Sequence, residues 1–339
     1  MKKYYTLLLP LIFLACNEPP KQQVDKEILS SLGKKYNIEF SELADSYRSK
    51  IEDDSSSLDA YIGYAESHIL LYVFGYVPRS ETVPEAKRAL IVVQQIDSLN
   101  TQTLKLAGIL SFLDWKWDES KAYFEQSIQQ DPKNLSARHW YSLWYSAMGD
   151  FENAMSQSDT IMTMDERDEY LVGRSSLLYF QYRFEEMKPL MEKSIKQHPE
   201  LPWAYDWLGM AYNGLEEHND ALKTYFKAFE LSDGTVEVTA GLGHALAHAG
   251  ETEMAKQIAD YYVIAAKDHY LPPVQRSFVH LGLSEYDTAI ELLEQAYQEH
   301  SWFLIFMQTE HWYDPLREDT RFINIMNRME FPKDDNKTK

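Results

Sequence analysis

The chain has 339 residues and a formal net charge of −20, with 53 acidic side chains against 33 lysines and arginines. A surface this acidic repels a phosphate backbone, so nucleic acid is not expected as a partner. Cysteine occurs once, at Cys16, which excludes a disulfide framework; a chain of this length does not need one.

The N-terminus has the pattern of an exported protein. Two lysines precede an uncharged stretch over residues 4–16, which is shorter than the roughly 20 residues that span a bilayer and has the form of a signal peptide. The run Phe13-Leu14-Ala15 comes directly before Cys16. This resembles the cleavage motif of bacterial lipoproteins, although Phe13 stands where that family prefers leucine.

The resemblance implies a lipid anchor. Residues 1–15 would be removed as the signal peptide, Cys16 would carry the lipid, and residues 16–26, which are polar and contain proline, would form a tether. Asn17 follows the cysteine, and by resemblance to lipoprotein sorting this favours the outer membrane. We therefore predict an exported protein that is lipid-anchored to a bacterial membrane. The alternatives are a plain signal peptide, or a buried hydrophobic terminus with an incidental thiol.

Residues 27–57 are predicted to form N-terminal helices, and from residue 58 the sequence repeats itself. The period is 34 residues, with one step of 33 in the main series. Copies begin at Leu58, Thr101, Leu135, Asp168, Pro202, Val236 and Tyr270. The eighth residue is always small: Ala65, Gly108, Ser142, Ser175, Gly209, Gly243 and Ser277. The twentieth is small in every copy but one: Ala86, Ser120, Ala154, Met187, Ala221, Ala255 and Ala289. Small side chains at fixed positions let two helices approach closely.

These positions resemble the tetratricopeptide repeat (TPR). The resemblance implies an all-α fold, a solenoid of helical hairpins in a right-handed superhelix, with about seven repeats over residues 58–303. Residues 304–331 are predicted to form a C-terminal capping segment, in which Asp314-Pro315 begins a helix. Phe322, Met326 and Met329 recur on one face of that helix. Residues 332–339 would be a disordered tail.

The order of features is also similar to one particular kind of TPR array. That array follows a winged-helix, nucleotide cyclase or kinase domain in many bacterial regulators, and AIELLEQAYQ with DPLREDTRF is the most specific stretch of the similarity. Only residues 17–57 precede the repeats here, too few for such an effector domain. The resemblance therefore implies the fold and a binding role, without enzymatic residues.

In the TPR family, certain positions of each first helix line a concave groove that binds peptides. The resemblance places seven candidate binding residues there: His139, Trp203, Asp206, Met210, Asn213, His244 and His248. The prediction is a membrane-anchored scaffold that holds a partner protein or peptide in this groove, without catalysis and without a cofactor.

His244 and His248 also raise the possibility of a metal site, because they lie one helical turn apart. A zinc hydrolase of the H-E-x-x-H type needs a glutamate after the first histidine, and here Ala245 follows His244. Asp206 or Glu237 could supply a third ligand, but no spacing requires it. We predict no metal, and ordinary groove-lining or surface histidines are the simplest interpretation.

Two other functions stay open. A metal-dependent hydrolase would carry a bound zinc at the histidine pair. A glycan-uptake accessory lipoprotein would present a contiguous exposed platform of Trp and Tyr side chains instead of burying Trp115, Trp117 and Trp140 in repeat packing.

Overall fold

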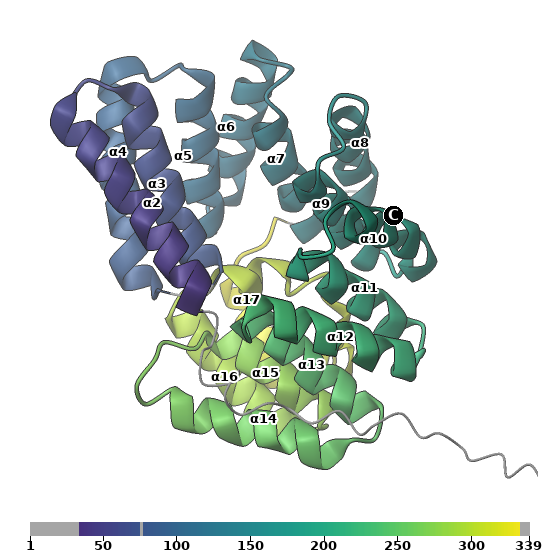
Figure 1. Ribbon diagram of the computed structural model, residues 1–339. Helices are drawn as coiled ribbons and strands as arrows, with labels where there is room; N and C mark the ends of the chain where they lie inside the picture. Colours follow the sequence, from purple (N-terminus) through teal and green to yellow (C-terminus); the bar gives the residue numbers. More distant parts are fainter. Residues whose placement is uncertain (1–33, 75–76, 333–339) are drawn as a thin grey trace, which may run out of the picture.

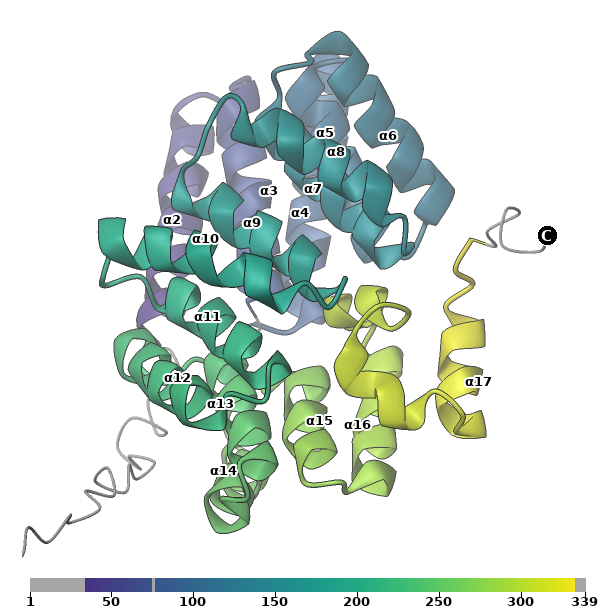
Figure 2. The same cartoon turned by 90° about the vertical axis from the view of Figure 1, so that its right-hand side faces the viewer.

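The computed structural model describes residues 34–74 and 77–332, and this part of the chain contains helices and no strand. Antiparallel helix pairs stack side by side and follow a curved path (Figures 1 and 2). The path brings the chain just after the last repeat back to the first, where the Tyr72 hydroxyl donates to the His300 carbonyl at 2.6 Å. The predicted signal peptide, Cys16, the predicted tether and residues 333–339 of the predicted tail lie outside the described residues.

In the part of the chain that the structure describes, one helix, α2 (Lys34–Asp53), precedes the repeats and packs on the first of them. The seven pairs are α3 (Leu58–Val73) with α4 (Arg79–Asp97), α5 (Thr101–Leu113) with α6 (Trp117–Gln130), α7 (Leu135–Ala147) with α8 (Phe151–Met162), α9 (Asp168–Tyr179) with α10 (Phe184–Gln197), α11 (Pro202–Gly214) with α12 (His218–Ser232), α13 (Val236–His248) with α14 (Thr252–Ala265), and α15 (Pro273–Gly282) with α16 (Tyr286–Gln298). None of the helices in the described ranges is long and apolar enough to cross a membrane.

The predicted register is confirmed for six of the seven first helices, which begin at the predicted residue. The exception is α15, which begins at Pro273 instead of Tyr270. Proline disfavours helical geometry in the residue before it, so the Pro272-Pro273 pair keeps the helix from starting earlier. Pro273 then occupies the first turn, where its missing N–H is tolerated.

The small residues lie where paired helices approach closely, as the repeat pattern predicts. All residues at the eighth and twentieth positions are buried, Met187 included. A Cβ atom on Gly108 would lie 2.7 Å from the ring of Phe124, and one on Gly209 would lie 2.9 Å from the ring of Tyr225. The paired helices are therefore too close for any larger side chain at these glycines.

The turn inside six of the repeats places its fifteenth residue in the left-handed region. Glycine occupies this position twice, with φ of 73° at Gly149 and 83° at Gly250. Four other repeats hold a side chain there at φ of 59–60°: Trp115, Tyr182, Glu216 and Ser284. A non-glycine residue in this conformation is strained by roughly 1 kcal/mol or more. The turn therefore keeps the same backbone conformation even where the residue is not glycine.

The end of the chain differs from the prediction. After α16 come two 3₁₀ helices, η1 (Trp302–Phe306) and η2 (His311–Leu316), and then α17 (Thr320–Arg328). Asp314-Pro315 lies inside η2 and does not begin the final helix. Asp319 caps α17 instead, because its carboxylate accepts from the backbone N–H of Arg321 at 2.8 Å.

Candidate binding surfaces

The inner side of the curved array is occupied by the chain itself. We call residues 300–331 the C-terminal segment. It reaches the first repeat, where the Trp302 indole donates to the Val73 carbonyl at 2.6 Å, and the second repeat, where the Trp117 indole donates to the Met329 carbonyl at 3.0 Å. It therefore spans the array, in addition to packing α17 on the last repeat as a cap would.

The C-terminal segment is part of the core. Leu304, Ile305, Met307 and Tyr313 are fully buried, and Phe306, Trp312 and Leu316 nearly so. Burying each such side chain stabilises a protein by about 1.5–3 kcal/mol. The set together therefore contributes on the order of 10 kcal/mol, comparable with the whole free energy of unfolding of a domain. A partner peptide would not readily displace it.

Two of the strained turn residues hold this segment. Trp115 stacks on the His300 ring with 3.6 Å between centroids. Tyr182 donates its hydroxyl to the Asp314 carboxylate at 2.6 Å. Both aromatic residues occupy the left-handed position of their turns, so at these two turns the strained backbone accompanies a contact that glycine could not make.

The histidine pair packs against the same segment. The His244 ring stacks on Trp312 at 3.9 Å and on His248 at 4.3 Å, and His244 Nδ1 lies 3.3 Å from Asn213 Nδ2. Burial, followed by the proximity of His248, holds the pKa of His244 well below its usual value, so this ring is neutral at pH 7. Within the described ranges, no three His, Cys, Asp or Glu side chains are arranged to hold a metal ion.

The structure separates the seven candidate residues by exposure. Asp206, Asn213 and His244 are buried, whereas His139, Trp203 and Met210 are half-buried. Burial lowers the pKa of His139 to about 4. Only His248 is exposed. The structure brings Asn213, His244 and His248 together, but it places Trp203 elsewhere, with its ring 5.4 Å from Phe74. Direct contact with a partner stays a prediction for all seven.

The tryptophans named for glycan binding do not form an exposed platform. Trp115 lies against His300, Trp117 is buried and stacks on Phe331 at 4.8 Å, and Trp140 is half-buried. Their packing weighs against the glycan-uptake alternative.

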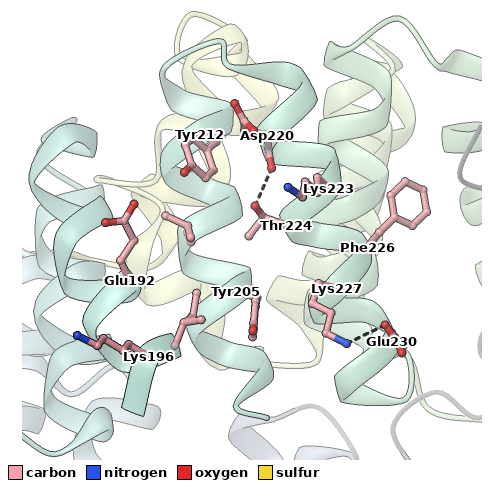
Figure 3. Close-up of a pocket in the computed structure, with 12 residues that line it drawn as sticks. Glu192, Lys196, Tyr205, Tyr212, Asp220, Lys223, Thr224, Phe226, Lys227 and Glu230 are labelled. Atoms are coloured by element: carbon pink, nitrogen blue, oxygen red, sulfur yellow. Dashed lines mark hydrogen bonds and ion pairs between the residues drawn. The ribbon is translucent and has the colours of Figure 1, made fainter. Parts of the chain in front are cut away.

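An open hollow lies on α10, α11 and α12, at residues outside the predicted groove. Its volume is about 540 Å³, and Figure 3 shows the side chains around it. Leu208 and Ile195 supply apolar surface, and Tyr205, Tyr212 and Phe226 supply aromatic rings. The charged lining residues are Glu192, Lys196, Asp220, Lys223, Lys227 and Glu230.

The charges around this hollow are of both signs. Lys227 pairs with Glu230 at 3.0 Å, whereas Lys196, Lys223, Glu192 and Asp220 form no ion pair within the described part of the chain. In Figure 3 the Lys223 ammonium is directed toward the space between Tyr212 and Tyr205. One feature of the sequence could have indicated this surface: Tyr205 and Tyr212 lie two turns apart on α11 and face outward.

Comparison with known proteins identifies the fold. No family model matches the sequence, and no curated protein matches it. A chain of the APC/C hetero-tetramer Cut9–Hcn1 is similar in structure, with a TM-score of 0.58 and 15% identity over 86% of this chain. This chain spans 52% of that one, or about half its length. A tetratricopeptide repeat protein from Parabacteroides merdae matches with a TM-score of 0.51 and 12% identity, over 74% of this chain and 98% of that one.

At these identities the similarity shows the fold alone. Together with the seven helix pairs and their small contact residues, it establishes the predicted fold class: an all-α solenoid of TPR type.

Proposed function

We propose that the protein is a membrane-anchored scaffold that holds a partner protein and does no chemistry of its own. The TPR-type fold supports this, because its rigid helices present a preformed surface, so binding loses little conformational entropy. The lipoprotein-like N-terminus supports the anchor, and the outer membrane is the proposed location.

The hollow on α10, α11 and α12 is the surface that supports this function best. It is open and combines apolar, aromatic and charged side chains, the mixture typical of recognition sites. Its occupant is a polypeptide segment that places one apolar side chain against Leu208 and Ile195. The rim carries both signs of charge, which suits a segment with mixed charges and disfavours nucleic acid. Among the predicted groove residues, His248 is the one that a partner could reach directly.

Site-directed photo-crosslinking in intact cells tests which surface binds. A photoreactive phenylalanine analogue at Phe226 should give one defined adduct, whereas the same analogue at exposed Ile91 on α4, far from the hollow, should not. The adduct's protein is then identified, purified and titrated against the scaffold.

In that titration Tyr212→Ala should weaken binding by about tenfold or more, because a buried aromatic anchor contributes over 1 kcal/mol. His248→Ala is the matched control on the inner side. If His248→Ala weakens binding and Tyr212→Ala does not, the inner surface binds the partner and the proposal for the hollow is wrong.

The anchor has its own test. Cys16→Ser should move the protein from the membrane fraction to the soluble fraction, and the wild-type N-terminal peptide should carry acyl mass. A variant that stays with the membrane, together with an unmodified wild-type Cys16, would contradict the lipoprotein proposal.

A further inference from the structure

The charges of the outer hollow follow the same order on both of its walls. On α10 the acidic Glu192 is followed one turn later by Lys196, and on α12 Asp220 is followed by Lys223. α10 and α12 run in the same direction, since each packs on α11 and is antiparallel to it. In Figure 3 the carboxylate accordingly lies above the lysine on each wall. The hollow is therefore acidic toward one end and basic toward the other.

Tyr212 lies at the acidic end. In Figure 3 its ring lies between Glu192 and Asp220. The Lys188 ammonium lies 5.0 Å from the centre of this ring, but it pairs with Glu217 at 3.4 Å. One cation of the chain thus faces three carboxylates, so a further cation from a partner would be attracted to this end.

Toward the Tyr205 end the free charge is positive. Lys227 pairs with Glu230 at 3.0 Å, and these two charges offset one another. Lys196 and Lys223 are exposed, and neither has an ion-pair partner among the residues that the structure describes. An anion from a partner would be attracted to this end.

The hollow is elongated along its helices. Its lining residues recur with helical spacing from Tyr205 to Tyr212 on α11 and from Asp220 to Glu230 on α12, which corresponds to about 10 and 15 Å of helix. The walls offer no backbone partner, because the N–H and C=O groups in the middle of a helix bond to one another. An extended segment would find none of the hydrogen bonds that a sheet edge provides, whereas a helix pairs its own backbone and presents only side chains.

We propose that the partner, whose binding here rests on the proposed function, presents an amphipathic α-helix with a basic side chain at the Tyr212 end and an acidic side chain at the Lys196 end. The opposite charges of the walls are one to two turns apart, so the two charges of the partner helix lie about four to seven residues apart. An apolar side chain between them contacts Leu208. Only one direction of the helix fits, because the reversed helix would bring like charges together.

The probe is a synthetic peptide of the partner segment that crosslinks to the analogue at Phe226. A segment without a basic and an acidic residue at this spacing, or an adduct with a second copy of this chain, would overturn the proposal. Fluorescence anisotropy with the full-length protein then measures affinity. A proline in the middle of the peptide, compared with an alanine at the same position, should weaken binding about tenfold or more, because proline breaks a helix. Equal binding would show that the segment is extended.

Reversal of the charges tests their order. The fourfold variant Glu192→Lys, Lys196→Glu, Asp220→Lys, Lys223→Glu keeps the net charge and reverses both walls. The wild type should bind the peptide about fivefold or more tightly than a peptide with its two charges exchanged, and the variant should show the opposite preference. Equal binding of both peptides to the wild type would contradict the proposal. Melting curves check that the variant folds; should it not, reversal on α10 alone should at least halve the preference.

A single substitution separates local from overall charge. Glu192→Lys should weaken peptide binding about fivefold or more, whereas Asp260→Lys, the same charge change at an exposed position of α14 outside the hollow, should weaken it less than about twofold. Equal losses would overturn the proposal, since net charge alone would explain them. Absence of any adduct at Phe226 would contradict the proposed function as well. A defined adduct whose peptide binds without regard to charge order would leave the proposed function standing and overturn only this inference.

Discussion

The repeat pairs and the C-terminal segment are held in place by different kinds of contact. Within a pair, short side chains recur at fixed positions, such as Gly209 against Tyr225. The C-terminal segment has no such period: large aromatic side chains and single hydrogen bonds to carbonyls attach it to the repeats, as at Trp302 and Val73. A pair is thus specified by local pattern, whereas the segment is specified by contacts that reach as far as 229 positions along the chain, as from Trp302 to Val73.

This difference explains why the inner surface is closed. A TPR-type array leaves a concave side to be filled, and this chain carries enough apolar residues after α16 to fill it. The segment that completes the core also covers His244, on which Trp312 stacks. In this protein, therefore, the positions that resemble a peptide-binding groove also serve as packing positions.

The largest expected effect comes from removing the segment. A chain that ends at Ser301 loses the burial of Leu304, Ile305, Phe306 and Trp312 and should lose cooperative unfolding, because about 10 kcal/mol is comparable with total stability. Circular dichroism during thermal unfolding measures this. A chain that ends at Pro332 keeps the described contacts and is the control. If the two chains melt within about 5 °C of each other, the segment is only a local cap.

The sequence predicted the periodic part of the molecule well. The register and small positions follow from local physics, since a helix pair cannot close over a large side chain and a sequence records that limit every 34 residues. The path of residues 300–331 could not be predicted, because Trp115 and His300 are far apart in sequence and nothing periodic relates them. The outer hollow depends on the relative placement of three helices, which sequence patterns do not specify.

The free energy of unfolding should depend on pH through the buried carboxyl group of Asp206. Its pKa is about 7 in the folded protein and 3.8 when unperturbed. Between pH 4 and 7 the unfolded chain is ionised while the folded chain holds the proton, so stability falls as pH rises. Asp206→Asn should therefore stabilise the protein by up to about 4 kcal/mol at pH 8 and by little at pH 4.

Urea denaturation at pH 4, 6 and 8 measures that difference, with exposed Asp260→Asn as the control. A constant difference across this range would mean that Asp206 is not buried in an ionisable state as the structure places it.

The two histidines should differ although they lie one turn apart. His244→Ala leaves a cavity against Trp312 and removes the contact with Asn213, so we expect a loss of about 2–3 kcal/mol. His248→Ala changes an exposed side chain and should alter stability by less than about 0.5 kcal/mol. Chemical denaturation of both variants checks this. Equal, small effects would show that Trp312 does not pack on α13 in solution.

Within the array, Gly209→Leu should overpack the pair α11–α12. The Tyr225 ring is fully buried and a Cβ on Gly209 would already lie 2.9 Å from it, so a loss of about 1–3 kcal/mol is expected without a change in oligomeric state. Asn219→Leu, at an exposed position of α12, is the control. Melting curves with size-exclusion chromatography would test both, and an unaffected Gly209→Leu would mean that the helices are farther apart than described.

The smallest effect distinguishes two turns with the same backbone. Glu216 and Trp115 have φ of 60° and 59°, and glycine would relieve the strain at either by about 1 kcal/mol, against a similar entropic cost in the unfolded chain. Glu216 is exposed, so Glu216→Gly should change stability by between zero and about +1 kcal/mol. Trp115→Gly gains the same relief but loses the stack on His300, and should destabilise the protein. Urea titrations of the two variants measure the change in free energy of unfolding. Changes of opposite sign would show that the contact with the C-terminal segment keeps the Trp115 turn strained. Changes of the same sign would mean that this contact contributes nothing.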